Sequence, residues 1–202
     1  MTSPPPAPLE VPLFPLHCVL FPGGVLPLRV FEARYVDMTR ECLKNKTPFG
    51  VCLIREGAEV GAPALPEAIG CLAGIADCDM QQLGVLNLRT RGQQRFRTVA
   101  REAGAQGLLR ARIELIAAEP EIPVPGEFRA CVSLLEAIVA DNAKGRFAAP
   151  CHFGDAAWVG YRLSEIVPVP LAAKQKLMEL EDSVSRLEIL HRFLSQRGLL
   201  RN

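Results

Sequence analysis

Several features that define common enzyme classes are missing from this sequence. No Gly-Lys dipeptide occurs in its 202 residues, so the phosphate-binding Walker loop is absent and ATP hydrolysis is excluded. The three histidines form no His-x-x-x-His pair, and the nearest cysteines, Cys71 and Cys78, are too far apart for a zinc knuckle. We therefore expect neither a cofactor nor a metal.

An excess of charge of one sign is also missing. The chain has 23 lysines and arginines against 22 aspartates and glutamates, so no overall field draws it to nucleic acid or to an anionic membrane. Long uninterrupted apolar runs are missing too. The most apolar segment, 11–35, is interrupted by prolines that exclude a membrane helix, at Pro12, Pro15, Pro22 and Pro27.

The N-terminus and the cysteines indicate the compartment. Residues 1–8 have neither the basic nor the apolar stretch of a signal peptide, and they are predicted to form a disordered, proline-rich tail. The seven cysteines are odd in number and scattered, which is typical of buried free thiols and not of a disulfide framework. We expect a reduced, cytoplasmic protein.

Residues 9–119 predict a β-rich subdomain. The proline-glycine turn at 22–24 makes the first segment a β corner, and a continuous apolar run at 49–54 indicates a strand buried on both faces in mid-sheet. Further strands are predicted at 69–76, 83–91, 95–100 and 108–116, a spacing typical of a small closed or half-closed barrel.

A helix is predicted within this subdomain, at 31–45. Its apolar residues fall at spacings of four, three and four, which places them on one face: Phe31, Tyr35, Met38 and Cys42. That face should lie against the sheet.

The pattern changes after the proline-rich segment 120–126, which is predicted to be a linker to a helical subdomain, 127–202. One helix is predicted from Glu127 to Asn142, and Asp155 is predicted to cap another that runs to Val167. The predicted fold class is therefore α+β.

The last helix is predicted to be long. An apolar rhythm of three and four continues from Leu171 to Arg197, which would make a helix about 40 Å long. Two i,i+4 ion pairs are expected on it, Asp182 with Arg186 and Glu188 with Arg192. The helix should pack on the one at 127–142, although the sequence leaves a weak homo-oligomer through its apolar stripe open.

Three segments, in order, resemble a known family. Phe21-Pro-Gly-Gly-Val-Leu-Pro-Leu-Arg-Val-Phe-Glu-Ala-Arg-Tyr35 resembles the signature of the N-terminal domain of Lon proteases. Gly92-Gln-Gln-Arg-Phe-Arg97 resembles that family's Gly-x-x-Arg-Phe strand turn. Lys174-Gln-Lys-Leu-Met-Glu-Leu-Glu-Asp-Ser-Val-Ser-Arg-Leu187 resembles its closing helix. Together the segments span nearly the whole chain.

The resemblance implies a β-rich pseudo-barrel, similar to the PUA architecture, followed by a helical bundle. It also implies a non-catalytic domain that recognises and holds protein substrates, related to a domain of cereblon. The chain ends at Asn202, where the ATPase module of a full Lon protease would begin. We therefore expect a stand-alone module that binds polypeptides in connection with proteolysis or quality control, and the sequence leaves open whether a separate ATP-dependent protease works with it.

The candidates for catalysis lack a supporting pattern. A Lon-type protease uses a Ser-Lys dyad, and the nearest imitation is Ser133 with Lys174 or Lys176, but Ser133 falls inside a predicted helix without a glycine-rich turn. Cys151 and His152 are adjacent, and adjacent residues seldom point at each other. We expect no enzyme, with an unrecognised small hydrolase as the alternative.

Two other polar pairs have simple structural interpretations. Asp77 and Asp79 could hold a cation, but a turn between strands explains them more simply. Glu32 and Arg34 are expected to brace the junction of barrel and helix.

A basic segment supports a rival hypothesis of RNA binding, with Arg89, Arg91, Arg95 and Arg97 at its centre. Seven arginines lie close together there: Arg89, Arg91, Arg95, Arg97, Arg101, Arg110 and Arg112. Only Phe96 offers an aromatic ring for base stacking, which argues against RNA. The simpler interpretation is that they are solvated strand positions paired with acids. The favoured hypothesis is a groove between barrel and bundle that binds a polypeptide segment, whose lining the sequence leaves unknown.

Overall fold

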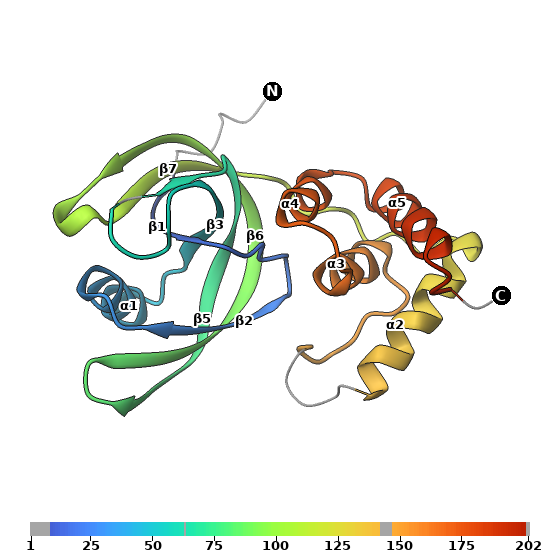
Figure 1. Ribbon diagram of the computed structural model, residues 1–202, viewed down its shortest axis with the longest axis horizontal. Helices are drawn as coiled ribbons and strands as arrows, with labels where there is room; N and C mark the ends of the chain where they lie inside the picture. The colour runs from blue at the N-terminus through green and yellow to red at the C-terminus, as the bar shows by residue number, and fades with distance from the viewer. Residues whose placement is uncertain (1–8, 63, 142–146, 201–202) are drawn as a thin grey trace, which may run out of the picture.

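The computed structural model describes residues 9–62, 64–141 and 147–200, and the predicted tail at 1–8 lies outside them. The architecture is α+β, with a β-rich part that holds helix α1 beside a group of helices, α2–α5 (Figure 1). The strands are β1 (Leu9–Leu16), β2 (Val25–Val30), β3 (Phe49–Glu56), β4 (Leu65–Pro66), β5 (Ile69–Gln82), β6 (Val85–Ala103) and β7 (Leu109–Leu115). The helices are α1 (Ala33–Asn45), α2 (Arg129–Asp141), α3 (Ala156–Ile166), α4 (Leu171–Glu179) and α5 (Ser183–Gln196), with 3₁₀ turns at Ala105–Gly107 and Gly126–Phe128.

The strands close into a ring. β1 pairs in parallel with β3 and antiparallel with β7, and the order continues from β7 through β6 and β5 back to β3. β2 pairs with β6, and β4 with β3. Because β3 has strands on both sides and apolar groups on both faces, residues 49–54 are all buried, as predicted.

Helix α1 packs against the inner residues of the sheet. Tyr35, Met38 and Cys42 are buried with Phe14 and Phe49, and the rings of Phe14 and Tyr35 stack with centroids 4.0 Å apart. The prediction for Phe31 is wrong: the helix begins at Ala33, and Phe31 is 56% exposed. Glu32 ends the extended backbone and its carbonyl accepts the first helical hydrogen bonds.

Strand β6 corrects two predictions. The strands expected at 83–91 and 95–100 are one strand, and the turn expected at 92–97 is absent from it. Opposite β5, the register passes from Ala73 with Gly92 to Cys71 with Arg95, so β6 holds an extra residue as a bulge and continues. β5 also runs on to Gln82, which places Asp77 and Asp79 within a strand and not in a turn.

The first two helices of the helical part agree with the sequence. The segment 126–141 is helical, and α3 begins after Asp155 as predicted. The Asp155 carboxylate accepts from the backbone N–H groups of Ala157 at 3.2 Å and Trp158 at 3.1 Å. A local side-chain cap therefore determines where α3 starts.

The prediction of one long last helix is wrong. Residues 171–197 form α4 and α5, which are separated at Leu180, whose backbone is extended. The Asp182 carboxylate accepts from the backbone N–H of Ser185 at 2.7 Å and so caps α5. Arg186 turns inward and makes no ion pair with Asp182, whereas Glu188 and Arg192 pair at 2.9 Å as expected.

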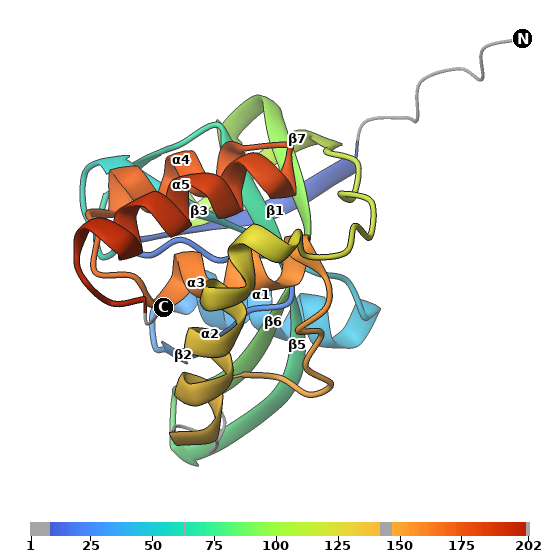
Figure 2. The ribbon, with the colours of Figure 1, turned by 90° about the vertical axis from the view of Figure 1, so that its right-hand side faces the viewer.

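The β-rich part and the helices share a core. Phe21 and Ile69 from the β-rich part are buried together with residues of α3 and α5. Figure 2, viewed from the helical side, shows α2–α5 in front of the strands. α5 packs mainly on α3 and meets the 126–141 segment through Phe128, whose ring centroid is 5.7 Å from that of His191. Among the described residues, no helix is long and apolar enough to cross a membrane.

Candidate functional site

Two glycine-containing segments, far apart in sequence, contact each other. The backbone N–H of Gly23 donates to the Gly92 carbonyl at 2.8 Å, and the Gly92 N–H donates to the Gly24 carbonyl at 2.8 Å. Gly23 has φ +74°, a conformation that other residues rarely adopt. A Cβ at Gly92 would overlap the Phe21 carbonyl oxygen. The glycines therefore let the 21–24 loop lie directly on β6.

Helix α3 holds the same loop from the other side. The Arg162 guanidinium donates to the Pro22 carbonyl at 2.6 Å and pairs with Glu165 at 3.0 Å. Arg162 is almost fully buried, and its burial lowers the pKa of the guanidinium while Glu165 opposes that effect. The loop is thereby fixed between β6 and α3.

A buried ion cluster joins the connector after β7 to both parts of the molecule. Glu119 pairs with Arg186 at 2.6 Å and with Arg95 of β6 at 3.2 Å, and it also accepts a hydrogen bond from the Tyr161 hydroxyl. The side chains of Arg95 and Glu119 are each 3% exposed, and that of Arg186 is 0% exposed. The Arg186 guanidinium lies over the Tyr161 ring, 4.1 Å from its centroid. Burial raises the pKa of Tyr161, which keeps this hydroxyl protonated as a donor.

The same arginines end helix α4. Arg95 donates to the carbonyls of Met178 at 2.8 Å and Leu180 at 2.6 Å, and Arg186 donates to those of Leu177 at 2.9 Å and Leu180 at 2.6 Å. These carbonyls carry the negative end of the α4 dipole. Two cations are therefore balanced by one carboxylate and a helix C-terminus.

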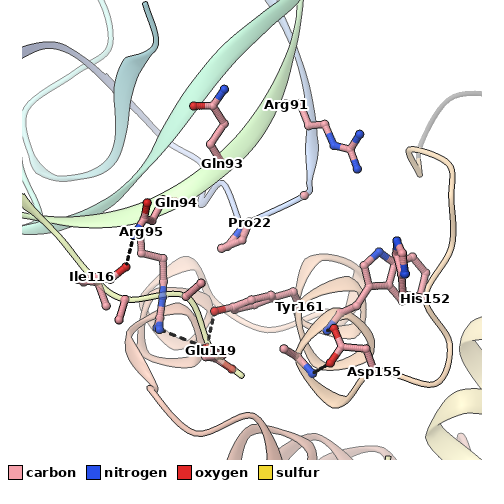
Figure 3. A pocket seen from close by; sticks show the side chains of 15 residues that line it. Pro22, Arg91, Gln93, Gln94, Arg95, Ile116, Glu119, His152, Asp155 and Tyr161 are labelled. Carbon is pink, nitrogen blue, oxygen red and sulfur yellow. Dashed lines mark hydrogen bonds and ion pairs between the residues drawn. The ribbon is translucent and has the colours of Figure 1, made fainter. Parts of the chain in front are cut away.

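A cavity of about 400 Å³ opens between β6 and α3, beside this cluster. Its β side includes Arg91 and Gln93, and its helical side includes Trp158 and Tyr161. Figure 3 shows Arg91 on the β side and His152 and Asp155 across from it, with Tyr161 and Glu119 to their left. We call this cavity, together with its lining, the junction groove.

The floor of the junction groove is tied to β6. The Ile116 N–H donates to the Arg95 carbonyl at 2.9 Å, and the side-chain amide of Gln94 donates to the Ile116 carbonyl at 2.9 Å (Figure 3). Ala117 and Ala118 follow and complete an apolar floor. The groove thus combines an apolar surface with a few polar groups, as binding sites commonly do.

A second cavity, of about 390 Å³, lies between α4 and α5 and is lined almost entirely by apolar side chains, among them Val167, Leu180, Ile189 and Phe193. Sequence reasoning missed it because a single long helix would have no such cleft. The break at Leu180 creates it.

The arginines proposed for RNA binding do not all reach the surface. Arg89, Arg91 and Arg97 are exposed, whereas Arg95 is buried. Arg95 belongs to the ion cluster, Arg89 lies opposite Asp77 on β5, and Arg97 lies opposite Glu114 on β7. Arg110 lies opposite Glu102 on β6, and Arg112 lies opposite Glu10 on β1.

The structure does not bring the Ser-Lys candidates together. Ser133 is exposed on α2, the Lys174 amine donates to the Glu165 carbonyl at 2.7 Å, and Lys176 pairs with Glu179 at 2.7 Å. Within the described ranges, no hydrogen bond joins Cys151 to His152, whose ring stands edge-on to Trp158.

The remaining reactive or charged groups are buried or take part in structural contacts. Burial raises the pKa of the Cys52 and Cys71 thiols to about 12, which makes them poor nucleophiles. Glu32 pairs with Arg34 at 3.0 Å, and Arg34 also donates to the Gly107 carbonyl at 3.2 Å. In the part of the chain that the structure describes, no group of three potential metal ligands occurs.

Comparison with known proteins identifies the family. The family model of the ATP-dependent protease La (Lon) substrate-binding domain matches residues 10–196. The chain belongs to this Lon family. The three segments that resemble Lon in sequence contact one another: 21–24 binds Gly92, and Arg95 binds the carbonyls of Met178 and Leu180.

Solved structures of Lon domains agree with this assignment. The crystal structure of a Lon N-terminal domain protein from Xanthomonas campestris is 34% identical, with a TM-score of 0.77 over 92% of this chain and 98% of that one. The N-terminal domain of the Mycobacterium avium complex Lon protease shares the fold, with 18% identity and a TM-score of 0.63 over 93% and 98% of the two chains. A search of curated proteins found no match.

Proposed function

We propose that this Lon-family chain is a non-catalytic module that recognises exposed segments of polypeptides, in connection with proteolysis or quality control, and that the junction groove receives them. The observation that carries the proposal is the match of nearly the whole chain to a family described as substrate-binding. The module would act in the cytoplasm and deliver what it holds to a separate ATP-dependent protease. The PUA-like architecture of the barrel and weak self-association stay predictions.

The geometry of the junction groove supports a polypeptide as its ligand. Its apolar floor at Ile116, Ala117 and Ala118 can bury side chains, and its polar rim can set the register of a backbone. Its walls are held by the Gly23–Gly92 hydrogen bonds and by the ion cluster, so the groove is preformed.

The chain carries its own probe for the test. Trp158 is its one tryptophan and lines the junction groove. A carboxymethylated unfolded polypeptide and a structured RNA should be titrated separately, at low and high salt, while Trp158 emission and ligand anisotropy are recorded. We expect the polypeptide to change Trp158 emission and to stay bound in high salt, because apolar burial drives its binding.

Two matched variants locate the binding surface. Ala118→Phe fills the junction groove, and Ala173→Phe fills the cavity between α4 and α5. We expect the first to weaken polypeptide binding by about tenfold, roughly the cost of losing 1.4 kcal/mol of contact, and the second to leave binding unchanged. Binding that is lost only in Ala173→Phe would move the site to α4 and α5. Salt-sensitive binding of RNA alone would refute the proposal.

A further inference from the structure

We propose that the junction groove selects polypeptide segments in which a carboxylate stands beside an aromatic or branched apolar residue, and that Arg91 binds the carboxylate. This inference rests on the proposed function and names the chemistry of its ligand. Its basis is the way in which the charges at the groove are already used.

The acids that line the junction groove are occupied. The Glu119 carboxylate is shared between Arg95 and Arg186, and the Asp155 carboxylate caps α3 through the N–H groups of Ala157 and Trp158. Each therefore has strong local partners. Neither is available to neutralise a further cation in the groove without giving up these bonds.

Arg91 is the arginine of the junction groove that has no acidic partner among the described residues. Across the described ranges its guanidinium takes part in no hydrogen bond or ion pair, and the side chain is exposed at the mouth of the groove. Arg162 already pairs with Glu165, and Arg95 is buried in the cluster. Within the described part of the chain, the groove therefore holds one guanidinium without a carboxylate partner, and a guanidinium binds a carboxylate through two parallel hydrogen bonds.

The position of Arg91 is rigid. Its backbone pairs with Val25 of β2 on one side and with Gly74 of β5 on the other, so the Cα is held within the sheet. Its charge also reaches α3: burial is the main cause that lowers the pKa of Arg162, and the positive charge of Arg91 lowers it further. An anion bound at Arg91 would relieve that repulsion.

The wall across from Arg91 is aromatic. Trp158 is half-buried, with the Phe153 ring edge-on at 5.2 Å between centroids and the His152 ring at 6.3 Å. Tyr161 and Ile116 continue the apolar surface inward. An aromatic or branched side chain can pack there while an adjacent carboxylate faces Arg91, so one short segment can use both walls.

The test uses matched labelled peptides with the full chain. One short sequence with a central Phe-Glu is compared with its Phe-Gln and Phe-Lys counterparts. Each peptide is made with a free and an amidated C-terminus, which separates a side-chain carboxylate from a terminal one. Binding is followed by anisotropy and by Trp158 emission. We expect at least one carboxylate form to bind about threefold to fivefold more tightly than the neutral form, which is the upper part of the range measured for exposed ion pairs.

Variants of one arginine complete the test. Arg91→Gln should remove the preference for a carboxylate, and Arg91→Glu should reverse it in favour of the Lys peptide. The control is Arg112→Gln, the same change at an exposed position on β7 outside the junction groove, which should keep the preference.

The outcomes separate the two proposals. Peptides that bind and change Trp158 emission, but with equal affinity for acidic, neutral and basic forms, would overturn the role of Arg91 and leave the proposed function standing. A preference that survives Arg91→Gln would also overturn it. Failure of every peptide and of the unfolded polypeptide to bind would refute the proposed function itself.

Discussion

At the scale of single residues, Arg186 shows how far a side chain can depart from its local pattern. It lies four positions after Asp182, a spacing typical of an exposed ion pair. It instead donates to Glu119, 67 positions away in the sequence. Its other donors satisfy carbonyls at the end of α4. All of these groups are buried, so the cluster depends on each of its members.

We predict that Arg186→Met strongly destabilises the fold. It leaves a buried carboxylate with less positive charge and leaves buried carbonyls without donors, so the free energy of unfolding should fall by about 3 kcal/mol or more. Urea denaturation followed by circular dichroism measures the change.

The control is Arg192→Met on the same helix. Its ion pair with Glu188 is exposed at both side chains, 69% and 60%, so the loss should stay within about 0.5 kcal/mol. Equal effects of the two variants would contradict the assigned role of the buried cluster.

At the scale of elements, β6 is the strand that organises the molecule. Its residues pair with β5, β7 and β2, and Gly92 near its middle receives the 21–24 loop. Arg95, three residues further, reaches the end of α4. One continuous strand therefore joins the barrel, the loop and the helices, which two short strands with a turn between them could not do.

We predict that Gly92→Ala separates the 21–24 loop from β6. The added methyl group would overlap the Phe21 carbonyl, which is backbone and cannot rotate away. The free energy of unfolding should fall by about 2 kcal/mol, as in overpacked cores, and binding in the junction groove should weaken. Denaturation together with the polypeptide titration measures both effects.

Gly126→Ala is the matched control. No atom lies within 4 Å of the position that its Cβ would take, so stability should change by less than about 0.5 kcal/mol. A harmless Gly92→Ala would show that the loop can shift without cost.

At the scale of the whole molecule, the β-rich part and the helices are joined by buried groups and not only by the 120–126 segment. Phe21 and Ile69 lie in the core of the helical part. The Arg95–Glu119–Arg186 cluster crosses the same boundary. Separating the two parts would expose this apolar surface and unpair buried charges.

We therefore predict a single cooperative unfolding transition. Trp158 fluorescence reports on the unfolding of α3. Alkylation of Cys52, measured by mass spectrometry, reports on the unfolding of β3. Burial raises the pKa of the Cys52 thiol to about 12 and protects it from alkylation in the folded state. The urea midpoints from the two probes should coincide. Clearly separated midpoints would show that the two subdomains predicted from the sequence, 9–119 and 127–202, unfold independently.

Local patterns were sufficient for much of the fold. The buried run 49–54, the α1 stripe at Tyr35, Met38 and Cys42, and the Asp155 cap of α3 were all predicted, because burial on a strand or helix repeats with a short period and a cap acts within one turn. The long last helix was predicted wrongly for the same reason. Its apolar rhythm runs across Leu180 unbroken, whereas the break depends on a cap and on arginine side chains from elsewhere.

The sequence by itself determined the fold class, most elements and the family, because these depend on periodicity, on local capping and on three recognisable segments. Only the tertiary structure decided the use of the charged residues. It buried Arg95, turned Arg186 inward to Glu119 and left Arg91 exposed at the groove. Sequence spacing cannot distinguish these arginines, because the partners of a side chain are set by which distant elements pack beside it.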